Sequence, residues 1–86
     1  MRIDPSNPGK LGEIVRYHRD QAGLTQIELA ELADLGKTSV FDVEKGKSTV
    51  RLDTLLKILT VLNVNIHLEG PLVEAFEAME QSQRPD

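Results

Sequence analysis

Cysteine is missing from the 86-residue chain, which excludes disulfide bonds, thiolate zinc sites and cysteine nucleophiles. Aromatic residues are scarce, with only Tyr17, Phe41 and Phe76, so Leu, Ile and Val must supply the core. No run approaches the roughly 20 apolar residues of a membrane span, and the N-terminus lacks the charged and apolar order of a signal peptide. We therefore expect one small cytoplasmic domain.

Residue patterns for catalysis are missing as well. His18 and His67 show no metal-ligand spacing, and no glycine-rich phosphate loop occurs. Gly9 and Gly12 are interpreted as residues of a helix start, and His18 as a hydrogen-bonded core histidine. We expect a chain that is not an enzyme and that uses no metal and no cofactor.

The formal net charge of −4 is unexpected for a protein that binds nucleic acid, because basic surfaces usually accompany such binding. Its distribution removes this objection. Residues 1–68 hold nine basic and nine acidic side chains, whereas residues 69–86 hold five acidic side chains and one basic. The middle of the chain is locally basic, through Lys37, Lys45, Lys47 and Arg51.

Apolar residues recur at helical spacing, which predicts a mostly α-helical domain over residues 8–63. Residues 1–7 lack this period and are expected to form a flexible arm. The predicted helices cover residues 8–22, 25–33, 37–44 and 52–62.

The boundaries of these helices carry local signals. Thr25 and Glu28 have the spacing of a capping box, which opens the second helix. Gly23, Gly46 and Asn63 are residue types that adopt the left-handed conformation at a helix end. We therefore expect the first, third and fourth helices to end at these positions.

Residues 64–69 alternate apolar and polar side chains, which is the pattern of a half-buried β-strand. No second segment of this kind occurs in the sequence. A lone strand cannot satisfy its backbone groups, so we expect it to pair antiparallel with the same strand of a second copy. The dimerisation residues on its apolar face are Val64, Ile66 and Leu68.

Residues 70–86 are expected to form an acidic C-terminal tail that is partly helical or disordered. Within it, Leu72 to Ser82 has the spacing of a short amphipathic helix, with Phe76 and Met79 on the apolar side. A helix of this length is marginal by itself.

Residues 25–44 hold two short helices joined by a three-residue break, the layout of a helix-turn-helix motif. The second helix must be slim at its start to enter a major groove about 12 Å wide. Here the chain resembles the Cro/cI (Xre) family of helix-turn-helix domains, over residues 11–64. The matching stretches are Leu24-Thr25-Gln26, Glu28-Leu29-Ala30, Val40, Val43-Glu44, Gly46-Lys47 and Leu52-Asp53-Thr54-Leu55-Leu56-Lys57.

This resemblance implies a lambda-repressor-like domain of four helices followed by one C-terminal β-strand. It also implies a transcriptional repressor that binds a palindromic operator in double-stranded DNA as a homodimer. With a strand in place of a fifth helix, the chain is similar to HipB-type antitoxins, which repress their own operon and bind a HipA-like kinase toxin. Two alternatives stay open: a stand-alone repressor without a toxin, and a protein-binding adaptor on the same fold.

The resemblance also implies roles for polar residues around the motif. Gln26 matches a glutamine that binds a DNA phosphate, and Lys37, Thr38 and Ser39 match the turn that reads bases. The basic turn after the third helix suits backbone phosphates, which position a protein without specifying sequence. Its members are Lys45, Lys47 and Ser48.

Two further residues of the third helix face outward in this reading, and their roles stay open. Phe41 stands where the family usually has a small polar residue. Two roles are open for it: contact with a thymine methyl group, or leaning sideways into the protein. Asp42 accepts a hydrogen bond from cytosine N4 or, as we favour, pairs with Lys45.

Arg19 and Glu44 match a family ion pair between the first helix and the end of the third. Such a pair fixes the reading helix on its support, and losing one partner strands a partly buried charge. Three departures weaken local helix starts by about 1 kcal/mol each. They are Asp34, where glycine is common, and Gly36 and Arg51 at positions usually held by Ser or Thr.

Overall fold

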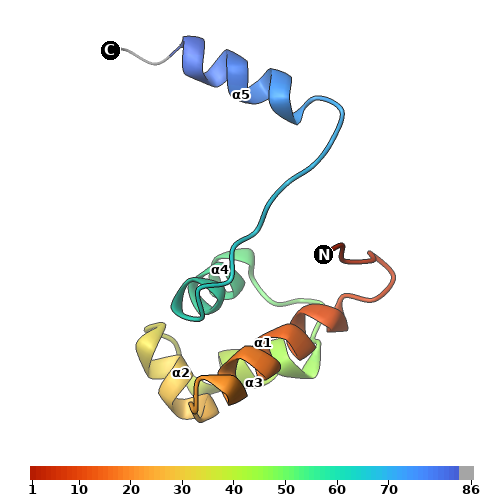
Figure 1. Cartoon of the computed structure of the whole chain (residues 1–86). Helices are drawn as coiled ribbons and strands as arrows, with labels where there is room; N and C mark the ends of the chain where they lie inside the picture. The colour runs from red at the N-terminus through yellow and green to blue at the C-terminus, as the bar shows by residue number, and fades with distance from the viewer. Residues whose placement is uncertain (84–86) are drawn as a thin grey trace.

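Four helices of the N-terminal part enclose one aliphatic core. The computed structural model describes residues 1–83, and Figure 1 shows its helices in order. Their bounds are Gly9–Gln21 (α1), Gln26–Leu32 (α2), Lys37–Lys45 (α3), Leu52–Val61 (α4) and Val73–Ser82 (α5). The first four follow the predicted segments to within two residues at each end. The buried core side chains are Val15, Leu29, Ala30, Ala33, Val40, Val43, Ile58 and Leu59.

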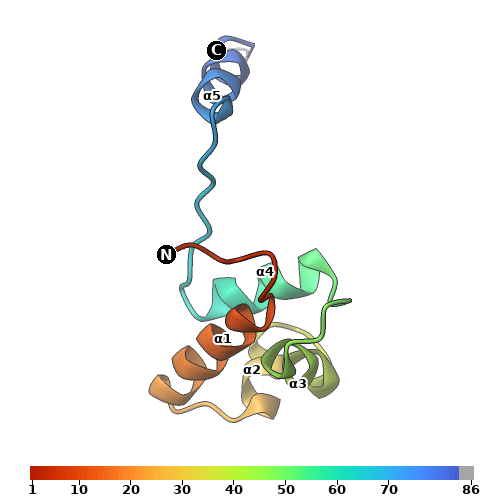
Figure 2. The ribbon, with the colours of Figure 1, turned by 90° about the vertical axis from the view of Figure 1, so that its right-hand side faces the viewer.

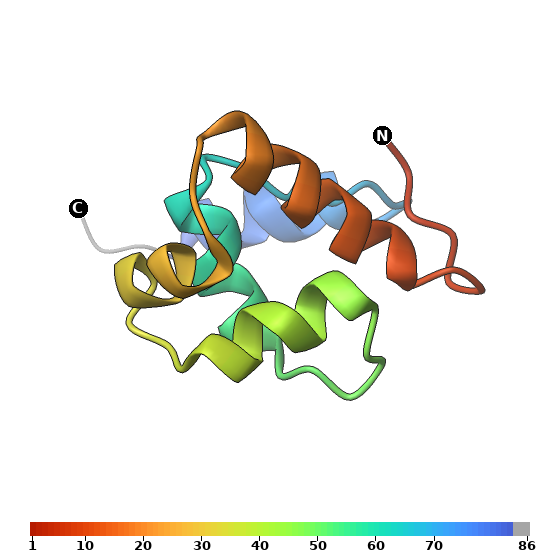
Figure 3. The ribbon, with the colours of Figure 1, turned by 90° about the horizontal axis from the view of Figure 1, so that it is seen from below.

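α1 lies along α3 at a distance that only glycine permits. A Cβ atom on Gly12 would stand 2.3 Å from the carbonyl oxygen of Val43 and 2.8 Å from that of Glu44. Both are backbone atoms of α3, so neither moves without the helix. Figure 3 shows α1 and α3 side by side, with α2 crossing beside their ends. Gly12 therefore sets the approach of α3 to its support, a role that its interpretation as a helix-start residue missed.

The start of α2 is fixed by the predicted capping box. The Thr25 hydroxyl accepts from the Glu28 amide at 3.1 Å, and the Glu28 carboxylate accepts from the Thr25 amide at 3.0 Å. The hydrogen bond from the backbone N–H of Thr25 is the main cause that lowers the pKa of Glu28, and a hydrogen bond with the Thr25 side chain lowers it further. The stabilisation that this carboxylate gives is therefore present above its ordinary pKa and is lost as the pH falls through the lowered value.

Left-handed residues end three of the helices as the sequence predicts. Gly23 has φ +71° after α1, Gly46 has φ +83° after α3, and Asn63 has φ +58° after α4. Asp34, between α2 and α3, also has a positive φ of 57°, which explains why glycine is common at this place in the resembling family.

The predicted strand over residues 64–69 does not form: no strand occurs among residues 1–83. The segment is irregular and follows the end of α4, where the Val64 amide bonds to the carbonyl of Leu59. Val64 packs against the core of its own chain, whereas Ile66 and Leu68 are exposed. The physical reason is that a strand requires a neighbouring strand for its ladder hydrogen bonds, and the single chain supplies none.

α5 stands apart from the four-helix body at the far end of this segment (Figure 2). It covers most of the region for which a short amphipathic helix was expected; Phe76 and Met79 are exposed on it, as is Leu72 just before its start. The N-terminal arm approaches the connecting segment, because Met1 to Ile3 and His67 to Gly70 line one hollow. The last part of the predicted acidic tail, residues 84–86, lies outside the described residues.

Within the described residues, no helix is long and apolar enough to cross a membrane.

Candidate nucleic-acid interface

The first turn of α3 is exposed and basic. Lys37 and Thr38 are exposed, and Ser39 beside them is half-buried. The opposite face of the helix is anchored by Val40 and Val43 in the core. The first turn contains no acidic residue, so the partial positive charge of the helix start is not opposed. α3 therefore presents a slim, cationic leading turn to the solvent.

Arg19 and Glu44 form a bidentate ion pair that connects α1 to the end of α3. Arg19 Nε donates to Glu44 Oε2 at 2.6 Å, and Nη2 donates to Oε1 at 3.0 Å. The two side chains are only 12 % and 5 % exposed. The same guanidinium donates from Nη1 to the carbonyl oxygen of Leu24 at 2.8 Å, which also fixes the loop before α2.

The hydrogen bond to Glu44 raises the pKa of Arg19 above its ordinary value, although burial acts in the opposite direction. The guanidinium is thus charged throughout the range in which proteins are handled. A charged, nearly buried donor with three hydrogen bonds is a rigid connection between α1, the α2 loop and α3.

Gln26 joins this network from the first position of α2. Its Nε2 donates to Glu44 Oε1 at 3.2 Å, so the half-buried side chain lies beside the end of α3. The family resemblance implied that Gln26 binds a phosphate, and the contact with Glu44 was not predicted. No local signal predicts it, because the two residues lie 18 positions apart.

The i+3 spacing predicted that Asp42 pairs with Lys45. In the structure, Asp42 pairs with Lys47 instead. Lys47 Nζ lies 3.6 Å from Asp42 Oδ2. The reason is the left-handed Gly46, which turns the chain back so that the Lys47 amide bonds to the Asp42 carbonyl at 3.0 Å. Lys45 is free of Asp42 and stands over the Phe41 ring, with Nζ 5.6 Å from the ring centroid.

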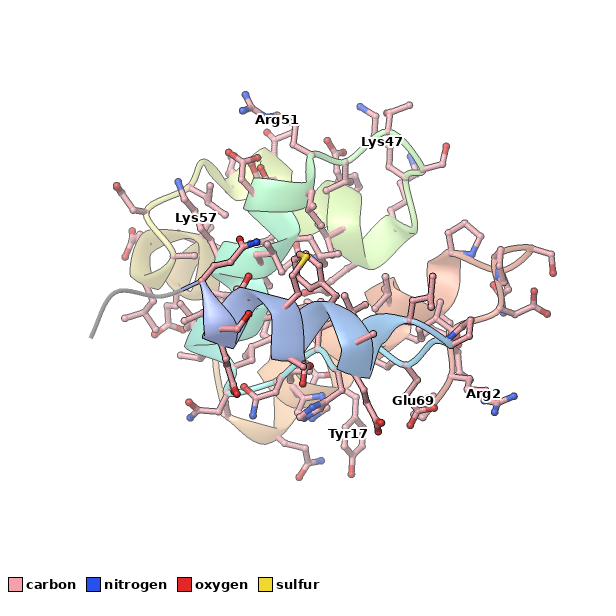
Figure 4. The ribbon with its side chains drawn as sticks, turned by 90° about the horizontal axis from the view of Figure 1, so that it is seen from above. Arg2, Tyr17, Lys47, Arg51, Lys57 and Glu69 are labelled. Atoms are coloured by element: carbon pink, nitrogen blue, oxygen red, sulfur yellow. The ribbon has the colours of Figure 1, made fainter. Side chains whose placement is uncertain are left out.

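The turn after α3 continues the cationic surface. Lys47 and Ser48 are exposed, and Arg51 follows at the start of α4. Figure 4 shows Lys47 and Arg51 projecting from the same side of the molecule, away from α5. Arg51 pairs with Asp53 at 3.1 Å, so part of its charge is already compensated.

Phe41 is 49 % exposed on the outward face of α3. Its ring does not enter the core, and both roles left open by the sequence, contact with a thymine methyl group and leaning sideways into the protein, stay predictions. It lines a shallow hollow between the start of α2 and the start of α3, together with Gln26, Ile27, Lys37 and Thr38.

His18 is half-buried, and its Nδ1 lies 2.7 Å from the carbonyl oxygen of Ile14, one turn earlier in α1. Across residues 1–83 no group of three or more His, Asp or Glu side chains has the geometry to hold a metal ion.

A short helix held by a capping box, a second helix locked beside it and an exposed cationic first turn define a helix-turn-helix protein. The helix-turn-helix family HTH_3 matches residues 15–68, and the chain belongs to this family. The family is the one that the resemblance to Cro/cI (Xre) domains predicted.

Two curated relatives support this membership. The HTH-type transcriptional regulator y4mF of Sinorhizobium fredii is 34 % identical over 64 residues, which cover 74 % of this chain and 84 % of the relative. The control protein C.SmaI of Serratia marcescens is 36 % identical over 56 residues, covering 65 % of this chain and 67 % of the relative.

Solved structures of HipB complexes share the fold. A chain of the HipA-HipB-O2-O3 complex matches with a TM-score of 0.72 and 27 % identity, over 83 % of this chain and 97 % of its own length. A chain of the HipB-O4 20mer complex matches with a TM-score of 0.71, also at 27 % identity, over 83 % and 97 % of the two chains. The expected similarity to HipB-type proteins is confirmed at the level of structure.

Proposed function

We propose that this protein is a sequence-specific transcriptional repressor that binds a palindromic operator as a homodimer. The observation that carries the proposal is the locked, exposed first turn of α3: Glu44 binds Arg19 and Gln26 at one end of the helix, while Lys37 and Thr38 stand free at the other. A reading helix must hold its angle when it enters the major groove, and this network holds it.

Within this proposal, some side chains contact DNA bases and others contact the phosphates of the DNA backbone. Lys37 donates to guanine O6 and N7, and Thr38 and Ser39 lie in the same leading turn. The second N–H of the Gln26 amide donates to a phosphate. Phosphates are also bound by the turn that follows α3, through Lys45, Lys47 and Ser48. Asp42 orients Lys47 across their 3.6 Å contact.

Substitution of two lysines distinguishes base contacts from phosphate contacts in one assay. In gel shifts with the operator and with variant duplexes, Lys37→Ala is expected to change the preferred base at one position of each half-site. Lys47→Ala is expected to weaken all duplexes alike and to reduce the slope of log affinity against log salt by about 1 for each subunit's lost phosphate contact. Tight binding that neither substitution alters contradicts the site assignment.

The dimer forms, in this proposal, through residues 64–69. Ile66 and Leu68 are 49 % and 77 % exposed, while Val64 is already packed on the core and anchors the segment. An antiparallel partner of the same sequence would supply the ladder hydrogen bonds that the single chain lacks. Two reading helices about 34 Å apart then reach successive major grooves and block the promoter.

Proline at position 66 tests this interface. Ile66→Pro removes a ladder donor and an exposed apolar side chain, so analytical ultracentrifugation is expected to show a monomer where the parent chain sediments as a dimer. The four-helix body is untouched, and its helical circular dichroism should persist. A variant that stays fully dimeric would place the interface elsewhere.

We also propose that the protein is the antitoxin of a HipA-like kinase. This rests on the likeness to chains from HipA-HipB and HipB-operator complexes over 83 % of the chain. The neighbouring open reading frame is expected to encode a HipA-like kinase, and size-exclusion chromatography of that product with this chain is expected to yield one stable complex. If operator binding is retained but no complex forms, the protein is a stand-alone repressor.

A further inference from the structure

Two apolar side chains interrupt the polar, cationic surface of the proposed DNA-binding face. Ile27 in the first turn of α2 is 52 % exposed, and Phe41 of α3 is 49 % exposed. Neither belongs to the core or to the half-buried residues packed on it. They meet across one hollow, whose other lining residues are Gln26, Lys37 and Thr38.

The position of this hollow limits what can occupy it. It lies between the first turns of α2 and α3, and Lys37, which contacts guanine in the proposed function, is one of its lining residues. Lys37 lines it, and Lys45 stands over the Phe41 ring, so its surroundings attract a polyanion. A shallow hollow that combines two apolar side chains with a cationic surrounding suits a small apolar group carried on a polyanion.

The major groove displays one such group, the methyl group on C5 of a pyrimidine. Thymine carries it in every T·A pair, and cytosine carries it only after methylation. We propose that Phe41 and Ile27 receive the C5-methyl group of one thymine in each half-site. This inference rests on the proposed function and adds a base preference to it, together with Phe41 and Ile27 as specificity-determining residues.

The test removes single methyl groups from the DNA and leaves the protein unchanged. An operator is first selected from random duplexes with the full-length chain, and each thymine is then replaced by deoxyuridine, symmetrically in both half-sites. Loss of one buried methyl contact lowers affinity about fourfold, so one symmetric replacement is expected to lower it about 15-fold. The other replacements are expected to leave affinity within about twofold.

Phe41→Ala is expected to bind the thymine and the deoxyuridine operators equally. Leu32→Ala serves as the matched control, because Leu32 is an exposed apolar residue of α2, 62 % exposed, that does not line the hollow. This variant should keep the 15-fold difference. Phe41→Ala that keeps the difference overturns the proposal.

A further arm distinguishes the two sources of the methyl group. Pairs of T·A, C·G and 5-methylcytosine·G are compared at the sensitive position. Tightest binding to T·A supports thymine, whereas tightest binding to 5-methylcytosine overturns the thymine assignment.

The failure of this inference differs from the failure of the proposed function. Preference for the operator with no effect of any deoxyuridine overturns the inference and leaves the repressor proposal standing. Equal binding of the operator and random duplex overturns both.

Discussion

Glu44→Ala is expected to lower the free energy of unfolding by about 3–5 kcal/mol, the usual cost of removing one partner from a buried ion pair. The substitution leaves the Arg19 guanidinium, 12 % exposed, with only the more exposed Asp20 carboxylate at 3.4 Å as a counter-charge, and it removes an acceptor from Gln26. A chain of this size has a total stability of the order of 5–10 kcal/mol. Urea unfolding followed by circular dichroism measures the effect as a lower urea concentration at the midpoint.

Glu13→Ala is the matched control for this prediction. Glu13 also pairs with a cation, Lys10, but at 3.9 Å and with side chains 70 % and 45 % exposed. Solvent screens such pairs, so this variant should lose less than about 1 kcal/mol. Equal losses for Glu13→Ala and Glu44→Ala would show that the Arg19–Glu44 pair does not hold α3.

A double variant separates a stranded charge from lost packing. Arg19→Met with Glu44→Leu replaces both members by apolar side chains of similar length and leaves no buried charge uncompensated. It is expected to recover part of the stability that Glu44→Ala loses, because well-packed apolar replacements of buried pairs are often tolerated. A double variant less stable than the single one would assign the effect to the hydrogen bonds to Leu24 and Gln26.

Gly12→Ala is the second prediction with a large effect. Its Cβ would approach two backbone carbonyl oxygens of α3 to within 2.8 Å or less, so the helices must separate. We expect a loss of about 2–3 kcal/mol, typical of overpacking at a site that cannot give way. Operator affinity should fall as well, because displacement of α3 changes the angle at which its first turn meets the groove.

Gly9→Ala, in the same helix, is the control. The nearest atom to a Cβ at Gly9 is the Asn7 side-chain oxygen at 3.7 Å, an ordinary contact. Alanine is favoured over glycine in a helix by about 0.5–1 kcal/mol, so this variant should be as stable as the parent or more stable. Thermal unfolding of both variants compares them directly, and a stable Gly12→Ala would contradict the close approach of α1 to α3.

The helices of the domain were predictable because their signals are local. The capping box of Thr25 and Glu28 involves residues three positions apart, and Gly23, Gly46 and Asn63 end helices through their own backbone conformation. Apolar spacing within each helix then indicates which face enters the core. Family resemblance added the pairing of Arg19 with Glu44, which lie 25 residues apart and have no local signal.

The contacts of the site that were missed all depend on how segments approach in space. The role of Gly12 exists only because α3 crosses there, and the pairing of Asp42 with Lys47 follows from the chain reversal at Gly46. The predicted strand shows the same limit, because alternation describes a segment that is able to pair, whereas pairing requires a second strand.

The helical segments, the motif over residues 25–44 and the cationic character of its surroundings were predictable from the sequence, since they follow from residue type and spacing along one chain. The folded structure was needed to show that Gln26 helps to hold α3, which lysine Asp42 binds and that Phe41 shares a hollow with Ile27. These outcomes depend on distances between residues of different segments, and such distances are set by packing rather than by local conformational preference.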